Sequence, residues 1–128
     1  MSVGLEFNGS HLTVTYPSYI TLVDILTVYG DLAIDARFMQ VRKMLIDCSH
    51  VRRFIIDEGG IKTFAESSRL VAGSQGNKPL DIAIISLDQG VTKKIQAMLD
   101  AGADKPHPWQ RKLFTSRDSA MAWLNNPA

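Results

Sequence analysis

Apolar residues recur along this chain at strand-like and helix-like spacings in turn, and each change of spacing marks a predicted element. Residues 5–7 and 12–16 are predicted to pair as strands around Asn8-Gly9, the dipeptide that best tolerates the positive φ angles of a type I′ turn. From residue 22 to residue 36 the apolar side chains lie three or four positions apart, which predicts a helix.

The rest of the chain predicts three further strands, at residues 43–47, 80–86 and 112–115. The second of these is apolar on both faces from Ile82 to Ile85, which is typical of a central strand with helices on both sides. The segment 51–56 is ambiguous. It fits either an added short strand or a loop that places its apolar side chains in the core.

Capping residues predict where the helices begin and end. Thr21 and Asp24 have the spacing of a capping box at the start of the first helix. The later helices are predicted to start at about Asp57 or Gly60, at Asp88 and after Ser116, with Gly73 and Gly102 just past the ends of the first two.

The order of these elements predicts an α/β fold in a single domain that spans residues 1–128. Strands that alternate with helices imply parallel neighbours joined by crossovers. We therefore expect a mostly parallel sheet of about four to five strands, with the strand at 5–7 as an antiparallel edge, and about four helices. A chain of 128 residues can bury a core without a disulfide or a metal.

Composition narrows the class of protein. The hydrophobic fraction of 45% and the charged fraction of 21% are ordinary for a soluble globular protein. The net charge is +1 and the basic residues are scattered in pairs, which argues against a nucleic-acid partner. The single cysteine fits a reducing compartment, and no apolar run is long enough to span a membrane. We therefore expect a cytoplasmic protein.

The segment 43–61 concentrates the residue types that carry chemistry. Asp47, Cys48, Ser49 and His50 follow a buried strand, where ligands and partners usually bind in α/β proteins. The sequence lacks the Gly-x-Ser-x-Gly elbow of a serine hydrolase, and a cysteine at a strand end is more often packed than nucleophilic. These residues therefore predict a binding face and no enzyme.

Metal and phosphate motifs are also absent from the sequence. No His-x-x-x-His or Cys-x-x-Cys spacing occurs, and His107, between two prolines, is expected to be an exposed loop residue. Glycine patterns that cradle phosphates are missing. Asp57 and Glu58 beside Gly59-Gly60 are interpreted as a helix cap rather than an anion site. We therefore expect neither a metal nor a cofactor.

Three segments share a pattern with a known superfamily: residues 44–49 (MLIDCS), 81–85 (DIAII) and 113–124 (LFTSRDSAMAWL). The pattern is a strand that ends in Asp-x-Ser, a helix, an apolar strand, a helix, and a Phe-ended strand before an Ala-x-x-Trp-Leu helix. It resembles the STAS superfamily of anti-sigma-factor antagonist domains, especially the stand-alone SpoIIAA-like proteins related to Sec14-type lipid-binding domains. The resemblance spans most of the chain. It implies a STAS-like βα superhelix and a non-enzymatic role in binding a regulatory protein or a small apolar ligand.

One feature departs from the STAS pattern. Phosphorylated members carry a serine at the entrance to the helix after the Asp-x-Ser strand, whereas residues 57–60 here read Asp-Glu-Gly-Gly. The resemblance therefore implies a domain without the usual phosphoserine switch. Glu58 places a carboxylate where the phosphoserine would stand, and its mimicry of the modified state is a hypothesis.

Two interpretations remain open. The first is a regulatory module that docks a protein through Asp47, Ser49, His50, Asp57, Glu58, Gly59 and Gly60. The second is a carrier or sensor of a lipophilic molecule, with an apolar pocket between the sheet and the first two helices that is lined by Phe38, Phe54 and Phe64. The exposed edge of the hairpin also leaves homodimer formation open.

Overall fold

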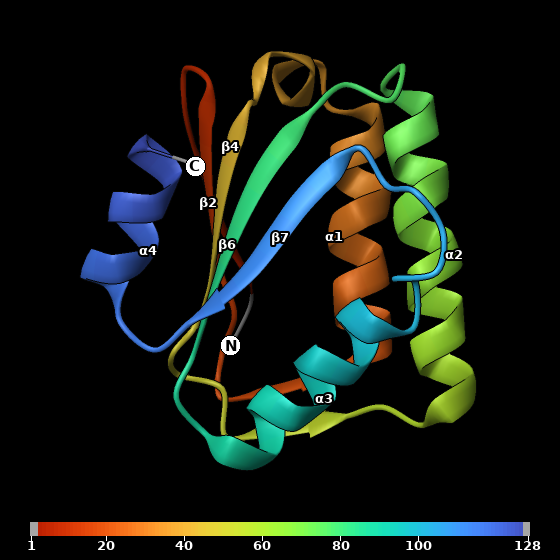
Figure 1. Cartoon of the computed structure of the whole chain (residues 1–128), viewed down its shortest axis with the longest axis vertical. Helices are drawn as coiled ribbons and strands as arrows, with labels where there is room; N and C mark the ends of the chain where they lie inside the picture. Colours follow the sequence, from red (N-terminus) through yellow and green to blue (C-terminus); the bar gives the residue numbers. More distant parts are fainter. Residues whose placement is uncertain (1–2, 127–128) are drawn as a thin grey trace.

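The computed structural model describes residues 3–126, in which helices cover both faces of a central sheet (Figure 1). The strands are β1 (Gly4–Asn8), β2 (His11–Thr15), β3 (Tyr19–Thr21), β4 (Lys43–Cys48), β5 (Arg53–Ile55), β6 (Leu80–Ser86) and β7 (Trp109–Phe114). The helices are α1 (Leu22–Ile34), α2 (Glu58–Ser74), α3 (Gln89–Asp100) and α4 (Arg117–Asn125), with a 3-10 helix η1 (Ala36–Gln40). None of these helices is both long and apolar enough to span a membrane.

The main sheet has the strand order β1-β2-β4-β6-β7. β1 pairs with β2 in antiparallel fashion, and the other neighbours in this sheet are parallel. β3 and β5 pair in a separate two-stranded parallel sheet. The predicted α/β class, the mostly parallel sheet and the antiparallel hairpin edge are therefore confirmed.

The pleat of the central strands divides the core between the two faces of the sheet. Met44 and Ile46 of β4 point into the larger cluster, which packs under α1, α2 and α3. Leu45 lies between them on the other face, in a smaller cluster with Ala120 and Leu124 of α4. Figure 1 shows the same arrangement, with α4 alone on one side of the sheet.

Local hydrogen bonds determine where the helices begin. The Thr21 hydroxyl oxygen accepts from the Asp24 N–H at 3.4 Å, and the Asp24 carboxylate accepts from the Thr21 N–H at 2.8 Å. This completes the predicted capping box. Asp57, Asp88 and Ser116 cap α2, α3 and α4, because each side chain accepts from a backbone N–H three residues later. The predicted helix starts are confirmed.

Two local predictions of turns are wrong. β1 and β2 pair Asn8 with His11, so the turn is centred on Gly9-Ser10 and Gly9 alone has a positive φ, of 60°. A turn centred on Asn8-Gly9 would pair Phe7 with Ser10 rather than with Leu12, a shift of two residues in this register. α2 continues past Gly73 to Ser74, and the chain turns with a left-handed φ of 71° at Gly76.

Two other segments resolve or change the predicted strands. The ambiguous segment 51–56 contains a true strand, β5, which buries Phe54 and leaves Ile55 exposed. β7 begins at Trp109 rather than at residue 112, because Trp109 pairs with Leu80 of β6 and is buried. The last strand therefore starts three residues earlier than predicted, and it includes a buried tryptophan.

Candidate functional site

The carboxyl end of β4 holds Asp47, the first of the polar residues that the sequence singles out. Asp47 is 8% exposed, and its Oδ1 accepts a hydrogen bond from the Ser49 N–H at 2.9 Å. Its Oδ2 lies 3.6 Å from Nη1 of Arg117 at the start of α4. Side chains alternate along a strand, so Asp47 shares the face of Leu45 and lies on the α4 side of the sheet. The carboxylate is thus engaged in closing the turn after β4.

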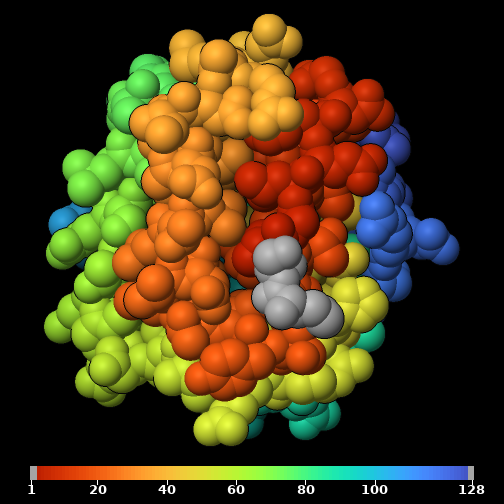
Figure 2. All heavy atoms as spheres, turned by 180° about the vertical axis from the view of Figure 1, so that it is seen from behind, coloured from red at the N-terminus to blue at the C-terminus, as the bar shows by residue number. Residues whose placement is uncertain are grey.

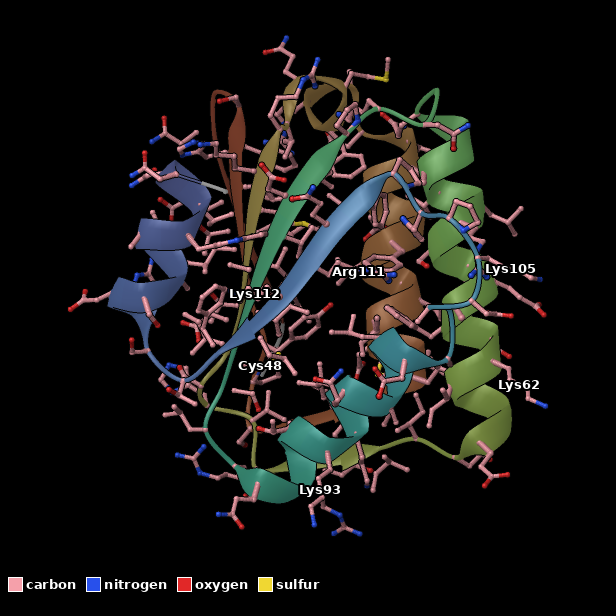
Figure 3. The ribbon with its side chains drawn as sticks, in the orientation of Figure 1. Cys48, Lys62, Lys93, Lys105, Arg111 and Lys112 are labelled. Carbon is pink, nitrogen blue, oxygen red and sulfur yellow. The ribbon has the colours of Figure 1, made fainter. Side chains whose placement is uncertain are left out.

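Cys48 points to the opposite face and is buried, as a packed thiol at a strand end should be (Figure 3). Burial, and to a lesser degree the neighbouring Asp47 carboxylate, raises the pKa of the Cys48 thiol to about 12. The thiolate is the nucleophilic form of cysteine. A thiol that stays protonated at neutral pH is therefore poorly suited to covalent chemistry.

Ser49 and His50 form the turn between β4 and β5. The Ser49 carbonyl accepts from Nη1 of Arg52 at 2.8 Å, and the His50 side chain is exposed. Within residues 3–126, no hydrogen bond links the side chains of Ser49, His50 and Asp57. The residue types of a hydrolase triad are present in this segment without the geometry of one.

Asp57 caps the start of α2. Asp57 Oδ1 accepts from the Gly60 N–H at 2.7 Å, and the exposed Glu58 lies in the first turn, where a negative charge stabilises a helix. Gly60 is buried against α1. A Cβ at this position would lie 3.0 Å from Cγ1 of Ile56 and 3.1 Å from Cδ2 of Leu22, so the residue at position 60 allows α1 and α2 to approach closely.

An apolar surface lies beside this entrance. Tyr19, Val23 and Ile55 are 52%, 69% and 41% exposed, although they come from β3, α1 and β5. Val23 and Ile55 line a shallow groove of about 320 Å³ together with Asp57 and Gly60. Figure 2 shows the start of α1 against the segment around β5 at the lower edge of the molecule. We call this surface, with Asp57 and Glu58, the β3–β5 face.

The structure divides the predicted partner-binding residues into separate groups. Asp57, Glu58, Gly59 and Gly60 lie at the β3–β5 face. Ser49 and His50 lie in the turn that precedes it, and Asp47 lies on the α4 side of the sheet. Sequence reasoning missed Tyr19 and Val23. Tyr19 lies beside Arg53 of β5 because β3 pairs with this distant strand, and Val23 is exposed on α1.

An apolar cavity of about 40 Å³ lies between the sheet and helices α1, α2 and α3. Phe54 and Phe64 are in its wall, together with Cys48 and Tyr29, whose ring centroid is 5.5 Å from that of Phe64. Phe38 is elsewhere. It is fully buried in η1, under the Lys78 ammonium. Sites for drug-sized ligands measure roughly 300–1,000 Å³, so this cavity needs to expand before it can hold a lipophilic molecule.

His107 is not the exposed loop residue that its flanking prolines suggested. Its imidazole is half-buried, with Nε2 3.2 Å from the Ser68 Oγ and Nδ1 accepting from the Trp109 N–H at 3.1 Å. Its ring centroid is 5.0 Å from that of Trp109. The prolines shape a loop that folds the imidazole back onto α2 and β7.

No protein-family model matches this chain, and no curated protein resembles it significantly in sequence. Within residues 3–126, no three His, Cys, Asp or Glu side chains are grouped closely enough to hold a metal ion. The geometry of the β3–β5 face therefore carries the argument for function.

Proposed function

We propose that this protein is a non-enzymatic, STAS-like regulatory domain that binds a partner protein through the β3–β5 face. The exposed apolar side chains of Val23 and Ile55 support this proposal, because they line one groove with Asp57 at the acidic entrance to α2. Tyr19 adds an exposed ring on β3, the strand that pairs with β5. A compact apolar patch with a polar rim is typical of a surface that binds another protein. A cytoplasmic location is part of the proposal and rests on the lone thiol of Cys48.

The α2 end of the proposed surface is acidic, whereas the Arg53 guanidinium lies over the Tyr19 ring at the β3 end. Asp57 is held by its capping hydrogen bond, whereas the exposed Glu58 carboxylate is free to face a basic group. In the STAS resemblance this is the position of a switch serine. We extend the proposal to Glu58 as a permanent negative charge in place of a phosphate.

The test requires a partner that is first identified and then purified. Tagged protein is used to capture proteins from the source cell, and the captured protein is produced alone for calorimetric titration. Val23→Glu should raise the Kd by at least about tenfold, because it places a charge within a desolvated apolar contact. Leu70→Glu is the matched control, since Leu70 is 74% exposed on α2 and lies outside the β3–β5 face.

The outcomes separate the parts of the proposal. Equal weakening by Val23→Glu and Leu70→Glu would remove the β3–β5 face as the binding surface. An unchanged Kd for Glu58→Gln would remove the role of the charge at this position while leaving the apolar contact in place. If light scattering shows a dimer that Val23→Glu dissociates, the occupant of the face is a second copy of this chain.

The cavity next to Phe54 and Phe64 supports a second candidate function, a carrier or sensor of a small lipophilic ligand. Its lining is almost wholly apolar, but binding would require the helices to move apart from the sheet. Native mass spectrometry of the purified protein tests this function. A retained lipophilic mass would support it, whereas a spectrum of the bare chain, with no binding of added fatty acid, would exclude it.

A further inference from the structure

A group of basic and aromatic residues lies between α2 and the edge strand β7. Arg69 comes from α2, His107 from the loop before β7, and Trp109 and Arg111 from β7 itself. The ring centroid of Trp109 is 6.1 Å from that of Tyr29 in α1. Figure 3 shows Arg111 directed from β7 toward the helices that cover this face of the sheet.

The histidine of this group is fully engaged and neutral. The Ser68 hydroxyl donates to the Ala65 carbonyl, so its oxygen accepts from Nε2–H of His107, while Nδ1 accepts from the Trp109 N–H. Burial and the positive charges of Arg111 and Arg69 lower the pKa of His107 to about 4. The imidazole therefore adds no charge to the group and fixes the loop against α2.

Several donors of this group have no acceptor. Nη2 of Arg69 donates to the Gly102 carbonyl at 2.8 Å, but its Nε is buried without a partner, as is Nε1 of Trp109, a residue only 4% exposed. Arg111 is half-buried, and between residues 3 and 126 no ion pair or hydrogen bond engages its guanidinium. Buried donors are nearly always satisfied in proteins, and an unpaired buried charge is costly.

Arg111 lies near a second positive charge, which increases the excess of donors over acceptors in this group. Arg69 is its charged neighbour, and the Tyr29 hydroxyl does not serve as a counter-ion, because burial raises the pKa of Tyr29 to about 12. Both guanidinium groups are close enough to His107 to lower its pKa, and the Trp109 ring lies 5.0 Å from the same imidazole, so the unpartnered donors are grouped around His107. A group with several oxygen acceptors and a negative charge would satisfy all three.

We propose that Arg69, Arg111 and the indole N–H of Trp109 form a binding site for the oxyanion of a small molecule, either a carboxylate or a phosphate. The site is distinct from the β3–β5 face, since Arg69 lies eleven positions after Glu58, or about 16 Å along α2. It does not rest on the proposed partner binding.

The indole N–H signals of the protein provide a direct test. The chain has two tryptophans, and Trp123 is an internal control because it belongs to α4 and packs on Phe114, on the other face of the sheet. ¹⁵N-labelled protein is titrated with inorganic phosphate and, separately, with acetate, with chloride at matched ionic strength as the reference. The Trp109 indole signal should move downfield and saturate, while the Trp123 signal stays in place.

Three variants, each of which removes one positive charge, test which side chains bind the anion. Arg111→Gln and Arg69→Gln should each raise the Kd by at least about tenfold, as expected for the loss of a charge-assisted hydrogen bond. Lys112→Gln is the control, because Lys112 is the next residue of β7 and points to the opposite face, 5.6 Å above the Phe114 ring. Its Kd should stay within about twofold of that of the wild type. The spectrum of each variant verifies its fold, and Arg69→Gln serves alone if Arg111→Gln does not fold.

Each outcome decides the proposal. A tighter Kd for phosphate assigns a phosphate-bearing ligand, and a tighter Kd for acetate assigns a carboxylate; both support the site. The absence of a saturable shift with either anion would overturn it. Equal movement of both indole signals, or equal weakening by Lys112→Gln, would show nonspecific screening and would also overturn it.

Discussion

Replacement of Gly60 by alanine tests whether close packing between α1 and α2 shapes the β3–β5 face. The added methyl group would meet Cγ1 of Ile56 at 3.0 Å and Cδ2 of Leu22 at 3.1 Å. Both distances are shorter than ordinary van der Waals contacts, so the two helices must separate or the side chains must shift. Gly59 is the matched control, because the nearest atom to a Cβ there is Oδ1 of Asp57 at 3.6 Å.

The expected changes in the free energy of unfolding have opposite signs at positions 59 and 60. Alanine in place of glycine stabilises a helix by up to about 1 kcal/mol, since it restricts the unfolded chain. Gly59→Ala should therefore leave the free energy of unfolding unchanged or raise it. Overpacking of a filled core costs about 1–3 kcal/mol, so Gly60→Ala should be less stable than Gly59→Ala by about that amount.

Urea unfolding followed by circular dichroism measures this difference. With a slope of about 2 kcal/mol per molar urea, the midpoint of Gly60→Ala should be about 0.5–1.5 M below that of Gly59→Ala. The reasoning fails if the two midpoints coincide or if Gly60→Ala is the more stable protein. Either result would mean that α1 and α2 have room that the distances at position 60 do not show.

Three further predictions concern the cap and the buried titratable groups. Asp57→Ala should lower the free energy of unfolding by about 0.5–2 kcal/mol in urea titrations, and Asp57→Asn should retain most of it, because asparagine also caps a helix. Burial raises the pKa values of Cys48 and Tyr29 to about 12 from 9.0 and 10.0. The unfolded chain therefore loses these protons first, and stability should fall as the pH rises from about 9 toward 12; Cys48→Ala should reduce the slope near pH 9–10 in the same titrations. The pKa of His107 is lowered from 6.5 to about 4, so stability should fall as the pH drops through this range, and His107→Gln should flatten that dependence.

The helices and the main sheet could be predicted because their signals are local or periodic. A cap such as Asp88 or Ser116 acts on an N–H three residues away, so the sequence contains both partners within one turn. The unbroken apolar run from Ile82 to Ile85 indicated burial on both faces, and β6 lies between β4 and β7. Neither inference depends on how distant segments pair.

The small sheet of β3 and β5 could not be predicted, because its pairing is not local. Each strand has three residues, and Ile20 pairs with Phe54 across a gap of 34 positions. Strands this short leave no periodicity to detect. The apolar surface formed by Tyr19, Val23 and Ile55 includes both of these strands. The proposed docking surface therefore lies in the part of the fold that could not be predicted from the sequence.

The same physics explains why a cluster in the sequence is a poor guide to a cluster in space. Asp47 and Cys48 are neighbours in the chain, yet the pleat of β4 sends the carboxylate toward Arg117 and the thiol toward the cavity on the other face. Arg69 and Arg111 are 42 positions apart, yet the fold brings them close enough for each to change the electrostatic environment of His107. Residues that are neighbours in a strand point to opposite faces of the sheet. Crossovers between parallel strands, in contrast, bring charges that are remote in the sequence to one sheet edge. Unpartnered donors at such an edge are therefore a better indication of a ligand site in this protein than the run of Asp, Cys, Ser and His after β4.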